Sequence, residues 1–198
     1  MHTAYIGMGA NLPSHAGPPE ATLAAAAARL ASLGRLVCRS SLYSTEPVGF
    51  AAQPRFVNAA VALETDLDPH ALLAALLRIE KEFGRDRSSA IHNGPRTLDL
   101  DILLLGNVNI SEPGLEIPHP RLADRAFVLF PLNEIAPRAL EARSGRTVAQ
   151  LLQSLNSTGE STADAVVQVE SELWRPGADR DVFCPDAPPR TNPSDNHR

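Results

Sequence analysis

The sequence contains a single lysine, Lys81, among its 18 basic residues, and no Gly-Lys-Ser or Gly-Lys-Thr step. This absence argues against the phosphate-binding loop of many nucleotide-binding enzymes, because that loop depends on a lysine that reaches the phosphates. Any phosphate that the chain binds would be contacted mainly by arginine. The planar guanidinium group of arginine donates paired hydrogen bonds to phosphate oxygens.

The chain also lacks an excess of positive charge, since its net charge is -5. We therefore expect no nucleic acid and no anionic membrane as a partner. No run of about 18 apolar residues occurs, and no basic stretch followed by an apolar one opens the sequence, so neither membrane insertion nor export is predicted. The two cysteines, Cys38 and Cys184, lack metal-ligand spacing, which favours a reduced, cytoplasmic setting.

Aromatic residues make up only 5% of the chain, so each ring is a candidate for a specific role. Phe56 lies near Asn58 in the sequence, and Phe127 lies near Arg125. Two rings with polar neighbours could bind a flat heterocycle between them. Phenylalanine is more often part of the core, and local sequence alone favours that interpretation for both rings.

The order of the expected helices and strands indicates the fold class, and 198 residues are enough for one catalytic domain. An alanine-rich helix opens at Pro18-Pro19-Glu20 and closes at Gly34, and a second helix begins at Asp68-Pro69 and ends at Gly84. Apolar alternation and short apolar runs predict strands at residues 4–9, 35–45, 56–65 and 98–105. This order predicts an α+β, ferredoxin-like βαββαβ sandwich.

Further elements are predicted at the C-terminal side of this sandwich. Residues 123–135 indicate a short helix or a strand and turn, and residues 147–155 indicate an amphipathic helix. From residue 156 onward the chain is rich in Ser, Asp and Pro. We therefore predict a catalytic domain over residues 1–156 and a weakly ordered tail over residues 157–198, and we expect truncation after Gly159 to change the melting temperature and turnover little.

The most specific motif is GPRTLDLD at residues 94–101. Alternate side chains share one face of a strand, so Asp99 and Asp101 would project together. Two nearby carboxylates repel each other unless a cation joins them, and two carboxylates with substrate phosphates are a typical Mg²⁺ environment. For an Asp-x-Asp pair by itself a solvated edge strand is the commoner case, and the preceding Gly-Pro-Arg and the apolar spacing count against that alternative here.

Positive charge that could complement this pair lies on both sides of it. Arg85, Arg87, Arg96 and Arg125 could bracket a triphosphate. Exposed arginines without a ligand are the commoner case, and Arg96 is the one whose neighbours constrain its position most. His119, which stands between two prolines, could direct an imidazole donor at a phosphate oxygen or could stabilise a turn.

Four stretches, taken in order, resemble the 6-hydroxymethyl-7,8-dihydropterin pyrophosphokinase family of folate synthesis. They are YIGMGANL at residues 5–12, FVNAAV at 56–61, HNGPRTLDLDIL at 92–103, and IPHP at 117–120 followed by RAF at 125–127. The resemblance spans residues 4–155 and is highly specific, because four separated matches occur in the same order. It implies transfer of the pyrophosphoryl group of ATP to the hydroxymethyl group of a reduced pterin, with AMP as the other product.

The resemblance also implies roles for individual residues. Asp99 and Asp101 would hold two Mg²⁺ ions that bridge the phosphates of ATP, the co-substrate. The phosphates would be contacted, and loop closure organised, by Arg85, Arg87, Arg96, His119 and Arg125. The pterin would be bound by Phe56, Phe127, Asn58 and the backbone near Thr45 and Val48. Weaker correspondences place adenosine contacts at Leu73, Glu80, Ile102 and Leu115.

Two other classes of function fit part of the pattern. A ferredoxin-like regulatory module could bind a nucleotide or amino acid without turning it over, but such a module would not need the two aspartates. A metal-dependent nuclease or nucleotidyltransferase could use Asp99 and Asp101, but it would need a basic surface for its polymer. Only an enzyme interpretation uses all of the clustered features.

Overall fold

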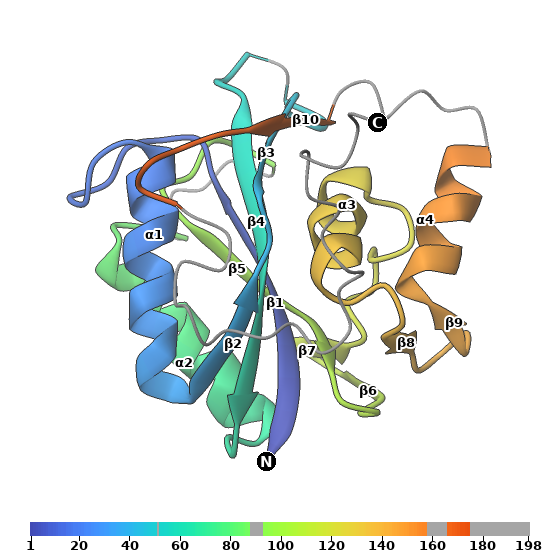
Figure 1. The fold of residues 1–198 in the computed structure, drawn as a ribbon. Helices are drawn as coiled ribbons and strands as arrows, with labels where there is room; N and C mark the ends of the chain where they lie inside the picture. Colours follow the sequence, from blue (N-terminus) through green and yellow to red (C-terminus); the bar gives the residue numbers. More distant parts are fainter. Residues whose placement is uncertain (51, 88–92, 158–165, 175–198) are drawn as a thin grey trace, which may run out of the picture.

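A computed structural model describes residues 1–50, 52–87, 93–157 and 166–174. Within these ranges the central sheet has six antiparallel strands, in the order β10, β3, β4, β1 and β5, with β2 also paired to β4 (Figure 1). The strands are β1 (His2–Ala10), β2 (Arg35–Arg39), β3 (Leu42–Thr45), β4 (Phe56–Thr65), β5 (Asp99–Leu105) and β10 (Val166–Val169).

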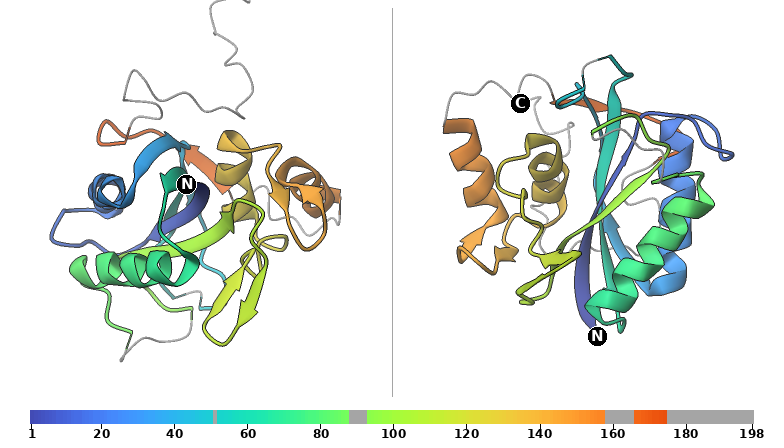
Figure 2. Two further views of the ribbon diagram at one scale, coloured as in Figure 1. Left: turned by 90° about the horizontal axis from the view of Figure 1, so that it is seen from below. Right: turned by 180° about the vertical axis from the view of Figure 1, so that it is seen from behind.

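Helices lie on both faces of this sheet (Figure 2). One face is covered by α1 (Pro19–Leu30), which a short 3-10 turn (Ala31–Leu33) extends, and by α2 (Pro69–Glu82). The other face carries α3 (Ala126–Ile135), and α4 (Val148–Ser157) packs on α3. The order of β1, α1, β2 with β3, β4, α2 and β5 confirms the predicted α+β sandwich, and α3 and α4 are among its additional C-terminal elements.

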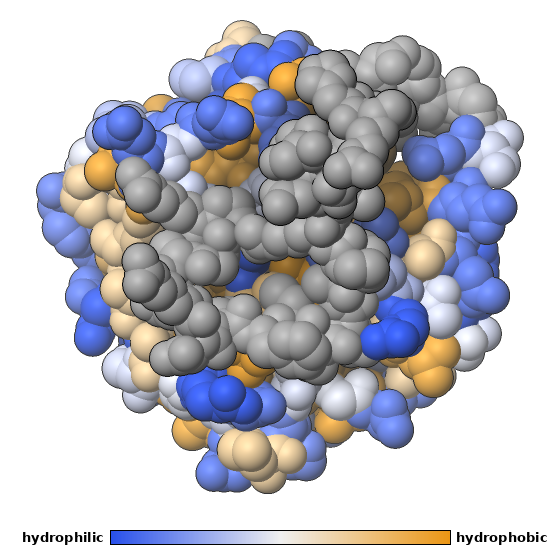
Figure 3. Space-filling view, viewed as in Figure 1, coloured by the Kyte–Doolittle hydropathy of each residue, from blue (hydrophilic) through white to orange (hydrophobic). Residues whose placement is uncertain are grey.

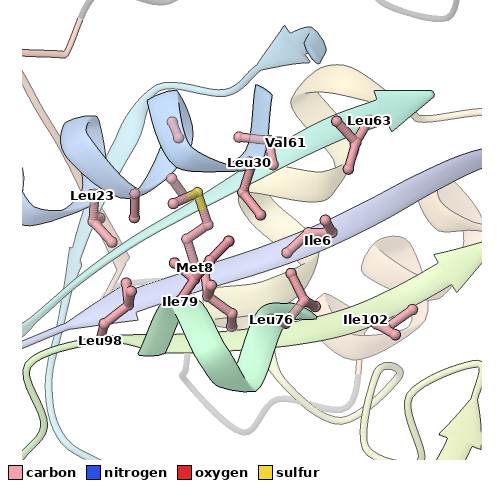
Figure 4. Close-up of a cluster of buried hydrophobic side chains, with 14 of the residues drawn as sticks. Ile6, Met8, Leu23, Leu30, Val61, Leu63, Leu76, Ile79, Leu98 and Ile102 are labelled. Atoms are coloured by element: carbon pink, nitrogen blue, oxygen red, sulfur yellow. The ribbon is translucent and has the colours of Figure 1, made fainter. Parts of the chain in front are cut away.

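The larger core lies between the sheet and the first pair of helices. Figure 4 shows Met8 of β1 among aliphatic side chains from α1, α2 and the neighbouring strands. Leu23, Leu30 and Leu76, which come from the two helices, are fully buried there. This apolar contact is the main stabilising contribution, and it fixes the strands whose ends carry the polar residues described below.

The ends of α2 follow the local chemistry that the sequence indicates. The Asp68 carboxylate accepts a hydrogen bond from the backbone N–H of Ala71 at 2.9 Å, and Pro69 occupies the first turn. Gly84, just after the helix, has a φ of 85°, a left-handed conformation that glycine adopts without strain. The chain is thereby turned toward the polar segment that precedes β5.

The predicted strand over residues 35–45 is interrupted at Ser40 and Ser41. The Ser40 hydroxyl accepts a hydrogen bond from the Ala60 backbone N–H at 2.9 Å, so a side chain takes the place of a strand partner there. β2 and β3 consequently pair with β4 as two separate strands. Two small hairpins complete the described elements: β6 (Ile110–Glu112) with β7 (Leu115–Ile117), and β8 (Leu140–Glu141) with β9 (Arg146–Thr147).

The prediction of a weakly ordered tail is wrong for residues 166–174. β10 adds to the edge of the sheet by pairing with β3, and Trp174 is only 2% exposed within the larger core. Composition misled the prediction, because a Ser- and Asp-rich stretch can still contain a few apolar residues that pack. The rest of the predicted tail, at residues 158–165 and 175–198, lies outside the described residues.

Cys38, on β2, is buried and disulfide-bonded, so the prediction of a reduced thiol is wrong at this position. Cys184, the other cysteine of the chain, lies outside the described residues.

No helix in the described ranges has the length and apolar character needed to cross a membrane. The face seen in Figure 3 is a mixture of hydrophilic residues and small apolar patches wherever it is coloured.

Candidate active site

A cavity of about 540 Å³ lies at one end of the sheet, where β1 ends and β4 and β5 begin. The first turn of α3 and the segments before β5 and α3 complete its wall. The lining includes twelve residues that the sequence analysis singled out: Thr45, Val48, Phe56, Asn58, Arg85, Arg87, Arg96, Asp99, Asp101, His119, Arg125 and Phe127. Residues from distant parts of the sequence therefore meet at one place.

Glycine forms part of the cavity wall. Gly9 of β1 is paired with Asn58 of β4 on one side and with Asp99 of β5 on the other. A Cβ atom at Gly9 would lie 3.1 Å from the Asn58 side-chain oxygen and 3.9 Å from the Asp99 Cβ. The missing side chain leaves room between an amide and a carboxylate, which a bound molecule can use.

The aromatic side of the cavity contains Phe56 and Phe127, each with an arginine over its ring. The guanidinium carbon of Arg96 lies 5.0 Å from the centre of the Phe56 ring, and that of Arg125 lies 5.4 Å from the centre of the Phe127 ring. These distances are within the range of a cation–π contact. Phe56 is 8% exposed, so it contributes both to the core and to the cavity.

Asn58 is held in a fixed orientation beside these rings. It is 6% exposed, and its side-chain N–H donates a hydrogen bond of 2.8 Å to the Thr45 hydroxyl. The amide keeps one further N–H and a carbonyl oxygen for a ligand. A flat heterocycle with donors and acceptors along one edge fits this combination of rings and amide.

The two aspartates lie on one face of β5, as their spacing predicts, and both line the cavity. Burial, and then the negative charge of Asp99, raises the pKa of Asp101 to about 6. From the described residues, no hydrogen bond or ion pair reaches the Asp101 carboxylate. Within the described residues the partly buried Asp101 carboxylate thus has no direct partner, and a bound cation would stabilise its charge.

Asp99, in contrast, is in contact with two arginines. Arg85 forms a short ion pair with one of its oxygens, and Arg96 lies 3.1 Å from the other. The Nε–H of Arg96 is buried and has no hydrogen-bond partner among the described residues. An unsatisfied buried donor is costly, so Arg96 is well placed to donate to an anionic ligand in the cavity.

Glu80, on the last turns of α2, organises the arginines from behind the cavity. It is 1% exposed, and its oxygens accept from Arg85 at 3.0 Å, from Arg87 at 2.6 Å and from the Leu100 backbone N–H at 2.9 Å. Burial raises the pKa of Glu80 despite these donors. The hydrogen-bond geometry, with three donors on one carboxyl group, nevertheless indicates the ionised form.

The hydrogen bonds of His119 define its tautomer. Its Nδ1 accepts from the backbone N–H of Arg121 at 3.1 Å, and its own backbone N–H donates to the Leu103 carbonyl at 3.0 Å. Burial, followed by the charges of Arg125 and Arg121, lowers the pKa of His119 to about 4. The imidazole is therefore neutral near pH 7 and carries its proton on Nε2, from which it can donate to a phosphate oxygen.

The four residues assigned to adenosine contacts are placed differently. Among the described residues that line the cavity, none of the four is present. Ile102 and Leu115 are 6% exposed in the larger core, Leu73 packs against that core, and Glu80 contacts the arginines. Val48 does line the cavity but is 65% exposed, so it is at the rim.

Sequence reasoning missed several residues of the cavity. Arg121 and Asp124 line it from the segment before α3, and Val166 lines it from β10. Asn11 is also important, because its side-chain oxygen accepts from the Arg96 backbone N–H at 2.8 Å while its N–H group donates to Gln53 at 3.0 Å. The YIGMGANL stretch contains Asn11 and was a usable signal, whereas Val166 had none.

The donor set of the cavity fits Mg²⁺. Within the described ranges no group of three or more His, Cys, Asp or Glu side chains is placed to hold a metal ion by itself. Mg²⁺, however, is usually bound by one or two carboxylates, with substrate phosphates and water as its remaining ligands. The partly buried Asp101 carboxylate, which has no direct partner among the described residues, and the adjacent Asp99 satisfy that requirement.

Comparisons with known proteins agree with this arrangement. Residues 5–137 match the family described as 7,8-dihydro-6-hydroxymethylpterin-pyrophosphokinase (HPPK). The chain is 48% identical over 150 residues to the 2-amino-4-hydroxy-6-hydroxymethyldihydropteridine pyrophosphokinase of Pseudomonas aeruginosa, covering 75% of this chain and 88% of that protein. The Bacillus subtilis protein of the same name is 43% identical over 147 residues, covering 73% and 84%.

The fold of this chain is also similar to that of a solved structure. The wild-type Plasmodium falciparum HPPK-DHPS structure matches with a TM-score of 0.63 at 14% identity, covering 86% of this chain and 48% of that one. This chain therefore spans about half the length of that solved structure. At such low identity the match speaks for the fold alone.

Proposed function

Because the chain belongs to the 7,8-dihydro-6-hydroxymethylpterin-pyrophosphokinase family, we propose that its cavity is the site at which ATP and a reduced pterin react. The enzyme transfers the pyrophosphoryl group of ATP to 6-hydroxymethyl-7,8-dihydropterin in folate biosynthesis. One observation carries the assignment of the site: the acidic pair and the two phenylalanines face the same cavity. The regulatory-module and nuclease alternatives are not consistent with this family.

The pterin would bind at the aromatic side. Phe56 and Phe127 would stack against the ring system, and Asn58 would hydrogen-bond its polar edge with the groups that Thr45 leaves free. Thr45 and Val48 would complete the rim through their backbone groups. The hydroxymethyl group would then extend toward Asp99 and Asp101.

The triphosphate of ATP would bind at the polar side. Arg96, with its unsatisfied Nε–H, and Arg85 would contact phosphate oxygens after release from Asp99. Arg87 and Arg125 would add charge, and His119 would donate through Nε2. The four residues assigned to adenosine would support the site indirectly. Glu80 would hold the arginines by hydrogen bonds, and Leu73, Ile102 and Leu115 would pack in the larger core behind the site.

Asp99 and Asp101 would hold Mg²⁺, and we propose two ions. When bound, Mg²⁺ supplies positive charge that stabilises the phosphate oxygens during transfer. The pterin hydroxyl oxygen forms a bond to the β-phosphorus, the bond from that phosphorus to the α,β-bridging oxygen breaks, and AMP leaves. The hydroxyl proton passes to solvent. No side-chain nucleophile is required, so positioning and electrostatic stabilisation provide the rate enhancement.

The proposed partners are the two small substrates, with neither nucleic acid nor membrane among them. The net charge of -5 supports the absence of nucleic acid. The proposed location is the cytoplasm, where ATP is supplied.

We expect Phe127→Ala to weaken pterin binding by about 1 kcal/mol or more, because one stacking surface is lost. ATP affinity should stay unchanged. Calorimetric titration with each substrate measures both affinities, and Phe56→Ala should behave alike. Phe130→Ala is the matched control, since Phe130 lies on the same helix next to Tyr43. Equal losses for the two substrates in Phe127→Ala, or no binding of the pterin to the unaltered protein, would contradict the proposal.

A further inference from the structure

Val166 lies on the cavity wall although it is far along the chain from the other lining residues. It is outside residues 5–137, which match the family, and it belongs to the segment whose composition suggested a tail. In the ladder between β10 and β3, Val166 is paired with Thr45. Thr45 in turn accepts the hydrogen bond that orients Asn58. The strand from the C-terminal segment thus lies directly beside the amide side of the cavity.

Side-chain alternation places the residues of β10 in two environments. Val166 and Gln168 share one face, and Gln168 donates a hydrogen bond of 3.0 Å to the Ser41 hydroxyl. On the opposite face, Val169 packs against the larger core, and Val167 is 51% exposed. The register is therefore well defined, because a shift by one residue would expose Val169 and turn Val166 away from the cavity.

Trp174 holds this strand in place. Its indole N–H donates a hydrogen bond of 2.7 Å to the Ser40 carbonyl, and the guanidinium carbon of Arg39 lies 5.5 Å from the ring centre. With 2% of its surface exposed, Trp174 is among the largest fully buried side chains of the described residues. A large anchor at the end of a short edge strand compensates for the small number of ladder hydrogen bonds.

We propose that β10 is a wall of the pterin-binding cavity, with Val166 as a specificity-determining residue and Trp174 as the residue that positions it. This inference rests on the proposed function, because it assigns the cavity to the pterin. The reduced ring of a 7,8-dihydropterin carries a nonpolar methylene group at C7, and the Val166 methyl groups provide an apolar surface for that part of the ligand. Phosphate binding takes place at the other side of the cavity and does not involve β10.

The test compares Val166→Ala with Val167→Ala, which makes the same change at the neighbouring, solvent-exposed position. We expect Val166→Ala to raise the dissociation constant for 6-hydroxymethyl-7,8-dihydropterin about three- to tenfold, from the loss of two partly buried methyl groups. The dissociation constant for ATP should be unchanged. Val166→Thr, which keeps the shape but replaces one methyl group with a hydroxyl, should also weaken pterin binding. Val167→Ala should bind both substrates as the unaltered protein does.

Trp174→Ala and truncation after Gly159 should lower the melting temperature and weaken pterin binding at least as much as Val166→Ala does. If Val166→Ala and Val166→Thr bind the pterin normally, β10 is only a structural support and the inference is wrong, even if Trp174→Ala is unstable. Failure of the unaltered protein to bind the pterin would instead count against the proposed function. The two failures are therefore distinguishable.

Discussion

Replacement of Asp101 by alanine is expected to lower Mg²⁺-dependent turnover about a hundredfold or more while the protein stays folded, because a metal ligand that contributes several kcal/mol in the transition state is lost. Asp101 belongs neither to the larger core nor to the smaller apolar cluster between the sheet and α3. The removal of Asp101 also relieves the Asp99 carboxylate of repulsion from a like charge. Asp99→Ala should have a comparable effect on turnover.

Turnover as a function of Mg²⁺ concentration, together with circular dichroism, measures this prediction. Asp124→Ala is the matched control, because Asp124 lines the same cavity but does not lie on β5. It should keep most of its activity. Near-normal activity of Asp101→Ala at ordinary Mg²⁺, with an unchanged spectrum, would show that the acidic pair does not hold the metal.

Replacement of Glu80 by alanine is expected to lower the free energy of unfolding by about 3 kcal/mol, since a buried carboxylate that accepts three hydrogen bonds is lost and a buried N–H donor is left without its acceptor. Arg85 and Arg87 would lose their shared acceptor, and the Leu100 N–H would be left without its partner. Turnover should fall as well, because Arg85 and Arg87 would no longer be held at the cavity.

Denaturant unfolding gives the free energy for this comparison. Glu82→Ala, on the same helix, removes an ion pair with Arg29 in which both side chains are about half exposed. That change should cost less than about 1 kcal/mol, because solvent screens an exposed pair. Equal destabilisation by the two substitutions would show that the hydrogen bonds of Glu80 add no more to stability than an exposed ion pair does.

The fold was predictable because its signals are local. The Asp68-Pro69 start and the Gly84 end of α2 depend on residues that are adjacent in the chain, and the alternating residues of β5 place two aspartates on one face without any knowledge of the neighbours. The four sequence stretches then indicated which polar residues belong together. The structure brings those residues to one cavity, although their individual roles stay predictions.

What could not be predicted depends on contacts between distant residues. Glu80 lies near the end of an ordinary helical pattern, and only the fold shows that its carboxylate contacts Arg85, Arg87 and the Leu100 N–H of β5. In our proposal the position of Val166 depends on the hydrogen bond between Trp174 and the Ser40 carbonyl, which is 134 residues away along the chain. Composition describes the average of a segment, so it could not identify one buried tryptophan within a polar stretch.

The most direct test of the central claim is the identity of the nucleotide product. We would incubate the protein with ATP, Mg²⁺ and 6-hydroxymethyl-7,8-dihydropterin, and separate nucleotides and pterins by chromatography, with a control that omits the pterin. Attack at the β-phosphorus predicts AMP and pterin diphosphate in equal amounts, and no AMP without the pterin. ADP as the main product, or AMP formed equally well in the control, would contradict the account.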